Sequence, residues 1–228
     1  METSILSDNT SISYTYNEEA ETTDVLYFIG DYYNCNWELN KAQKLYKQED
    51  GSYKAQIIAY DLKNGWKITR NNWSESWGTP INDGVMTNNN GGNVTQYGND
   101  NNTSYLVTFN PTDGKLSMDN EEKTWKLLGD FNNYSTYGSD MIVKYDDREN
   151  EWYLVPEIGE EKVNYVEMKV GDEWIIRSQM RSLEVTPSNI EGHFEANSDN
   201  KFTVSESGKY EIRWYFNKPT QYIVVIKK

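Results

Sequence analysis

The feature that most constrains the fold is an internal repeat with an offset of about 99 residues. Residues 25–34 (VLYFIGDYYN) align with 124–133 (TWKLLGDFNN), and in both an apolar stretch leads into Gly-Asp followed by aromatic and Asn residues. The stretch WKITR at 66–70 has its counterpart near 166–169. A repeat of this length predicts two copies of one folding unit, with the same order of elements in each.

The segments within each copy have the character of short β-strands. They are rich in Tyr, Val, Ile, Thr and Trp and are separated by turn residues, which is typical of an antiparallel sandwich. Each copy is expected to close with two strands, at 104–110 and 115–118 in the first and at 208–217 and 221–227 in the second. The best candidate for a helix is short, at 38–48.

We therefore predict an all-β chain of two tandem β-sandwich modules. The expected boundaries are 23–119 for the first module and 120–228 for the second, after a linker or extra strand at 1–22. A chain of 228 residues is long enough to form a core in each module.

Charge and cysteine content exclude several partner classes. The 36 acidic and 22 basic residues give a net charge of −14, which is the wrong sign for nucleic acid, anionic membranes or anionic polysaccharides. The single cysteine, Cys35, predicts no internal disulfide and no cysteine metal site. The polar residues after Met1 lack the charged and apolar pattern of a secretory signal, so we expect either a cytosolic protein or one whose leader has been removed. We expect neither a metal nor a cofactor.

Catalysis is not expected either. His193 is the only histidine, so any Ser-His-Asp or Cys-His arrangement or His-based zinc site would depend on it. It has no serine elbow or metal-spaced partner nearby, which predicts an exposed or partly packed loop residue. A glycosidase with two carboxylates stays open, although a sandwich of this size rarely forms the deep cleft that such an enzyme needs.

The segment at 66–78 concentrates three tryptophans and two cations. The Asn-Asn pair after Arg70 predicts a turn, which would leave Trp73 and Trp77 in an irregular loop. Exposed indoles beside Asn, Arg and Lys suit a neutral sugar, whose C–H faces stack on rings while its hydroxyls take hydrogen bonds. The alternative is that Trp66 and Trp73 close the end of the sandwich.

Together with the repeat, this segment resembles the tandem carbohydrate-binding modules of the SusE/SusF-type surface lipoproteins of Bacteroidetes. The second copy keeps Leu128-Gly129-Asp130 and its closing strands but lacks the Asn-Trp and Trp-Gly steps. In the first copy the matching residues are LYFIGD at 26–31, Trp37, WKITR at 66–70, Asn72-Trp73, Trp77-Gly78 and GGNV at 91–94.

The resemblance implies immunoglobulin-like sandwiches that hold starch or other α-glucan (maltooligosaccharide) chains for uptake without cleaving them. It places two aromatics in an arc, Trp37 with Trp73 or Trp77, and assigns hydrogen bonding to Lys67, Arg70 and Asn72. The candidates for a second site are Tyr134, Tyr137, Trp174 and Arg177.

The resemblance also implies a lipid anchor on the bacterial outer membrane, an N-terminal domain ahead of this chain, and association with an outer-membrane glycan transporter. Two alternatives remain open. The ligand could be another neutral glycan, such as a fructan or xyloglucan, or the chain could be a structural or protein-interaction module of a surface glycan-uptake complex.

Overall fold

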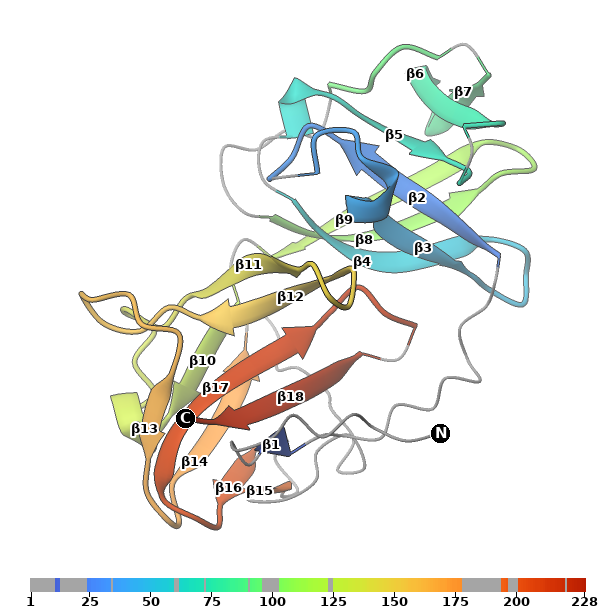
Figure 1. Cartoon of the computed structure of the whole chain (residues 1–228). Helices are drawn as coiled ribbons and strands as arrows, with labels where there is room; N and C mark the ends of the chain where they lie inside the picture. Colours follow the sequence, from blue (N-terminus) through green and yellow to red (C-terminus); the bar gives the residue numbers. More distant parts are fainter. Residues whose placement is uncertain are drawn as a thin grey trace.

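The computed structural model describes residues 11–12, 24–33, 35–59, 62–71, 73–89, 91–95, 103–122, 125–177, 194–196, 201–219 and 221–228 (Figure 1). The regular elements in these ranges are β-strands and three short 3-10 turns, so the prediction of an all-β chain is confirmed. The turns are η2 (Leu39–Lys41), η3 (Leu62–Asn64) and η4 (Asp130–Asn132).

Eight strands of the first copy form one closed sheet, in the order β2-β3-β4-β8-β9-β7-β6-β5. We predicted a two-sheet sandwich for this copy, and the hydrogen bonding differs because the β6–β7 hairpin reaches β9. The contact is the pair Val85 and Lys115, beside a bond from the Leu116 N–H to the Gly84 carbonyl at 2.7 Å. The strands are β2 (Val25–Gly30), β3 (Gln43–Lys47), β4 (Tyr53–Ala59), β5 (Trp66–Thr69), β6 (Ser76–Asn82), β7 (Val85–Asn88), β8 (Thr103–Asn110) and β9 (Lys115–Glu122).

The remaining strands form two separate sheets. One has the order β1-β18-β17-β12-β11, with β13 also paired to β17, and the other has the order β10-β14-β16-β15. The first of these sheets includes β1 (Ser11–Ile12), which pairs with β18. The other strands are β10 (Lys126–Gly129), β11 (Met141–Asp146), β12 (Glu151–Pro156), β13 (Val166–Met168), β14 (Glu173–Arg177), β15 (Phe194–Ala196), β16 (Phe202–Val204), β17 (Gly208–Tyr215) and β18 (Tyr222–Lys227).

The closing strands expected for each copy are confirmed as the hairpins β8–β9 and β17–β18. The short helix expected at 38–48 is wrong, because only η2 and then β3 lie there. The buried Gln43 explains the strand, since its side chain donates to the Ile58 carbonyl at 2.8 Å and accepts from the Ile58 N–H at 3.0 Å. These two bonds hold β3 beside β4.

The repeat is visible in the strand register. Gly30, at the end of β2, pairs with Trp66 of β5, and Gly129, at the end of β10, pairs with Trp174 of β14. Each tryptophan is fully buried and is stacked on a phenylalanine. The counterpart of β5 is therefore β14, and the alignment of 66–70 with 166–169 is wrong.

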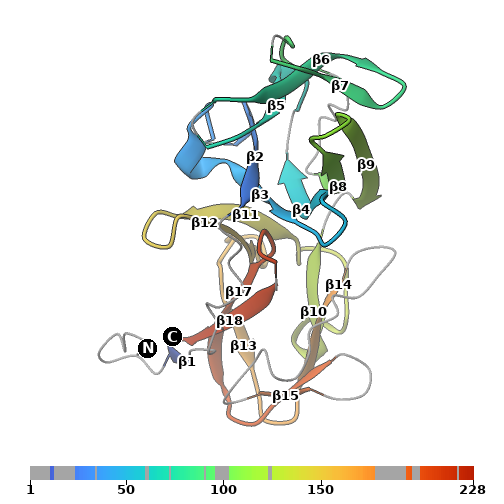
Figure 2. The same cartoon turned by 90° about the vertical axis from the view of Figure 1, so that its right-hand side faces the viewer.

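The two copies share a junction built around Asn217, which is 1 % exposed. Its side chain accepts from the Lys44 N–H at 2.6 Å and donates to the Lys44 and Gln56 carbonyls at 3.0 and 3.1 Å. The Tyr46 hydroxyl donates to the Asn217 carbonyl at 3.0 Å. Figure 2 shows β3 and β4 of the first copy facing β11 and β12 of the second at this junction. The division of the chain at residue 120 into two units that fold independently stays a prediction.

Across the described ranges, no helix has the length and apolar character required to cross a membrane.

Candidate functional site

The loop after β2 presents Trp37 at one end of the closed sheet. Trp37 has a left-handed backbone, with φ of 64°, and its N–H donates to the Gly30 carbonyl at 3.2 Å. Tyr32 anchors the loop, because its buried hydroxyl donates to the Phe28 carbonyl and accepts from the Gln43 N–H at 3.2 Å. The loop is therefore held at both ends, and the half-buried Trp37 indole has a defined place.

Gly65 allows Trp37 and Asn93 to lie against the same piece of backbone. A Cβ atom placed on Gly65 would lie 3.2 Å from Asn93 Cβ, 3.4 Å from Asn93 Nδ2 and 3.5 Å from Trp37 Cζ2. Asn93 is exposed, so its amide reaches solvent beside the edge of the indole. An aromatic ring near a planar amide is the combination predicted for sugar binding, and here Asn93 contributes an amide.

Lys67 lies two residues along β5 from Gly65, a separation of roughly 7 Å. Its ammonium group donates to the Gly91 carbonyl at 2.6 Å, which ties segment 91–94 to β5. Gly91 and Gly92 pack closely on Gly78, because a Cβ on Gly78 would lie 2.1 Å from the Gly92 carbonyl oxygen. Lys67 thus helps to position Asn93 and is itself half-buried, with ammonium protons left for a ligand.

Arg70 and Trp73 lie at the opposite end of β5 from Trp37. Five residues of extended chain from Gly65 to Arg70 correspond to roughly 16 Å. The Arg70 guanidinium forms ion pairs with Glu75 and Asp24. Hydrogen bonds from Lys47 and Tyr53 lower the pKa of the Asp24 carboxyl. Trp73 is 43 % exposed and has a left-handed backbone. Its backbone N–H donates to the Arg70 carbonyl at 3.1 Å.

The first copy does not place Trp37 beside Trp73 or Trp77, so the predicted arc of two exposed aromatics does not form. Trp77 is not in a loop but in β6, where it is 1 % exposed and packs on Phe109 with ring centroids 5.1 Å apart. It can offer no stacking face to a sugar. Trp66 is also buried, as the alternative reading expected. Asn72 and His193 lie outside the described residues.

In the second copy, Tyr134 occupies the position equivalent to Trp37. It too has a left-handed backbone, with φ of 54°, and its N–H donates to the Gly129 carbonyl at 2.9 Å. Lys201 Nζ lies 4.9 Å from the centroid of the Tyr134 ring and forms an ion pair with Glu173 at 3.1 Å. An aromatic ring with a polar neighbour therefore recurs at the same place in both copies.

The other three predicted residues of the second copy are not part of this cluster. Trp174 is completely buried and is wrong as a stacking residue. Tyr137 is 92 % exposed, and Arg177 lies at the other end of β14 from Trp174. The residues that the sequence analysis missed are Asn93 and Lys201. Asn93 directly precedes Val94, which pairs with the buried Trp66. Lys201 directly precedes Phe202, which pairs with the buried Trp174. These pairings become visible only in the strand register of the structure.

A scan of the sequence against protein-family models found no match, and a search of curated proteins found none either. Among solved structures, SusF from Bacteroides thetaiotaomicron matches with a TM-score of 0.33 and 13 % sequence identity. The match covers 90 % of this chain and 49 % of SusF. This chain thus spans about half the length of that protein.

Proposed function

We propose that this chain is a non-catalytic carbohydrate-binding protein whose first module holds a neutral glycan on Trp37. The observation that carries the proposal is that the Trp37 indole edge and the Asn93 side chain both lie against Gly65, within 3.5 Å of where a Cβ atom would stand on that glycine. A sugar ring stacks its C–H face on an indole, while an amide and an ammonium group bind its hydroxyls. Lys67, next along the strand, supplies the ammonium group.

The glycan that we favour is an α-glucan of the starch type, bound at the bacterial cell surface for uptake. This choice, together with a lipid anchor and a transporter partner at the outer membrane, comes from the resemblance of the sequence pattern to SusE/SusF-type modules. Tyr134 with Lys201 is the corresponding second site, and Trp73 is a further single stacking position. A site with one aromatic ring is shallow, so we expect binding in the micromolar to millimolar range.

The test is electrophoresis through native gels that contain starch, xyloglucan or a fructan. The variants are Trp37→Asn and Trp73→Asn, because asparagine tolerates the left-handed backbone that both positions require. Tyr137→Ala is the control, since its 92 % exposed ring belongs to neither site. Loss of one stacking ring should weaken binding about tenfold.

We expect starch to retard the wild type and Tyr137→Ala equally and Trp37→Asn much less. Retardation by xyloglucan or fructan alone would replace the α-glucan with that glycan. If no gel retards the wild type, carbohydrate binding is wrong, and a protein-interaction role takes its place. If Trp37→Asn migrates like the wild type in the retarding gel, the ligand binds elsewhere.

A further inference from the structure

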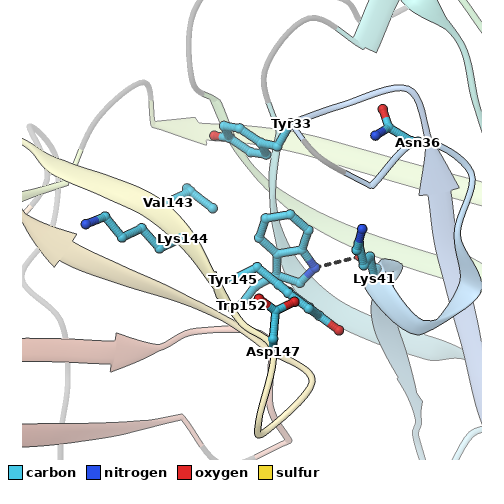
Figure 3. A pocket seen from close by; sticks show the side chains of 8 residues that line it. All are labelled: Tyr33, Asn36, Lys41, Val143, Lys144, Tyr145, Asp147 and Trp152. Atoms are coloured by element: carbon cyan, nitrogen blue, oxygen red, sulfur yellow. Dashed lines mark hydrogen bonds between the residues drawn. The ribbon is translucent and has the colours of Figure 1, made fainter.

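A cleft of about 650 Å³ lies between the two copies, and neither Trp37 nor Asn93 lines it. Its volume falls within the range of small-molecule sites, roughly 300–1,000 Å³. The first copy contributes the loop after β2 and η2, and the second contributes the β11–β12 hairpin (Figure 3). The lining residues are Tyr33, Asn36, Lys41, Val143, Lys144, Tyr145, Asp147 and Trp152.

Three aromatic rings form one wall of this cleft. Trp152 is 3 % exposed, and its indole lies between the rings of Tyr33 and Tyr145 (Figure 3). The ring centroids of Tyr33 and Trp152 are 5.8 Å apart with a tilt of 39°, and those of Tyr145 and Trp152 are 4.9 Å apart with a tilt of 59°. The three rings therefore pack against one another and give this wall of the cleft an aromatic character.

Hydrogen bonds across the junction hold the wall in place. The Trp152 Nε1–H donates to the Lys41 carbonyl at 2.7 Å, and the Tyr145 hydroxyl donates to the Asn40 carbonyl at 2.6 Å. Burial raises the pKa of Tyr145 to about 12, so this hydroxyl stays protonated at neutral pH. A ligand would meet rings that are already ordered, which lowers the entropic cost of binding.

The polar groups at the rim favour a neutral ligand. Lys41 is paired with Glu38 at 3.0 Å, and the Lys144 ammonium group donates to Asn164. Asp147 and Asn36 are exposed, so the rim presents a carboxylate and an amide together with the two ammonium groups. Mixed charge of this kind attracts neither cations nor anions strongly, whereas the same groups can bind many hydroxyls.

From this geometry we infer that the junction cleft is an additional saccharide site, formed jointly by the two copies and separate from Trp37 and from Tyr134. The inference rests on the proposed function for the class of its ligand, a neutral oligosaccharide. Because one loop carries Tyr33 and Asn36 toward the cleft and Trp37 toward Gly65, the same segment would serve two saccharide sites.

Nuclear magnetic resonance of the indole N–H groups can separate the two sites. The chain has 8 tryptophans, and each gives one indole signal when the protein is isotope-labelled. The Trp152 signal reports on the cleft through its bond to Lys41, and the Trp37 signal reports on the first site. The variants Trp152→Phe and Trp37→Asn assign the two signals. The probes are maltoheptaose, a xyloglucan oligosaccharide and a fructan oligosaccharide, titrated separately.

We expect one of these probes to shift both signals. Tyr33→Asn, which keeps the left-handed backbone at φ of 45°, should weaken the affinity read from Trp152 about tenfold. The affinity read from Trp37 should stay within about twofold. Tyr145→Ala removes one of the two rings that the other copy contributes and should give the same result, with folding checked by thermal unfolding.

Each outcome decides one of the two claims. A shift of Trp37 without a shift of Trp152 would overturn the cleft and leave the proposed function standing. A shift of Trp152 alone, lost in both tyrosine variants, would establish the cleft and remove the first site. A shift of Trp152 that neither tyrosine variant weakens would show that the signal reports a distant change, which overturns the cleft. If no probe shifts either signal, both proposals fail.

Discussion

At the scale of single residues, backbone conformation separates the two tryptophans of the first copy that keep exposed surface from the two that build its core. Trp37, Trp73 and Tyr134 all have positive φ, and all three keep exposed surface in turns. Trp66 and Trp77 lie in strands and are buried. A positive φ is costly for a bulky residue, so these turns persist only because hydrogen bonds around them fix the chain.

The contrast between Trp77 and Trp73 gives a prediction about stability. Trp77→Ala should lower the free energy of unfolding by about 3–5 kcal/mol, because it leaves a large cavity beside Phe109. Trp73→Asn removes a ring that is 43 % exposed and should cost about 1 kcal/mol or less. Urea denaturation measures both values. Equal losses would contradict the different placement of the two indoles.

At the scale of elements, the two copies use the same close approach between neighbouring strands. A Cβ on Gly30 would lie 2.4 Å from the Gly65 carbonyl oxygen, and a Cβ on Gly129 would lie 2.5 Å from that of Glu173. Such contacts are too short for any side chain, so glycine is required at the end of β2 and at the end of β10. The Gly-Asp pair that reveals the repeat in the sequence is therefore a consequence of strand packing.

Alanine substitution tests this equivalence. Gly30→Ala and Gly129→Ala should each lower the free energy of unfolding by about 3 kcal/mol, because the backbone carbonyl cannot move without separating the strands. Gly159→Ala is the control: its Cβ would meet nothing within 4 Å, and only its left-handed backbone is penalised, by about 1 kcal/mol. Chemical denaturation of the three variants supplies the comparison. Losses at Gly30 and Gly129 no larger than at Gly159 would contradict the shared packing.

The sequence predicts strands well and their partners poorly. The β8–β9 and β17–β18 hairpins follow from local alternation and turn residues. Trp174 could not be identified from the sequence as the counterpart of Trp66. The connection between β10 and β14 is longer than that between β2 and β5, so a constant offset of about 99 residues no longer aligns the two tryptophans. The site shows the same limit: Trp37 could be named from its motif, but the place of Asn93 beside Gly65 follows from the pairing of Val94 with Trp66.

At the scale of the whole molecule, the junction joins the copies through buried polar contacts. Glu151 is buried between Lys44 and Lys218, with ammonium-to-carboxylate distances of 2.9 and 2.7 Å. The hydrogen bonds of Asn217 reach two strands of the closed sheet. Buried polar groups of this kind are costly when separated, so the copies should unfold together.

Asn217→Ala should disrupt this coupling. It leaves the Lys44 N–H and the Gln56 carbonyl without their junction partner and should cost about 3 kcal/mol. In differential scanning calorimetry we expect one transition for the wild type and two for the variant. Asn82→Ala, at an exposed position of β6, is the control and should unfold as the wild type does. A single unshifted transition in Asn217→Ala would show that the junction contributes little to stability.

The anchoring of the loop after β2 by Tyr32 has a consequence for how this protein can diverge. One side chain, 2 % exposed, fixes the segment that carries Tyr33 and Asn36 to one surface and Trp37 to another. A single substitution at Tyr32 alters both surfaces at once. A substitution at Tyr145 alters only the cleft, and one at Asn93 alters only the surface that carries Trp37. The two surfaces are therefore expected to evolve together. A change in this loop that alters the ligand bound at one surface also alters the other surface.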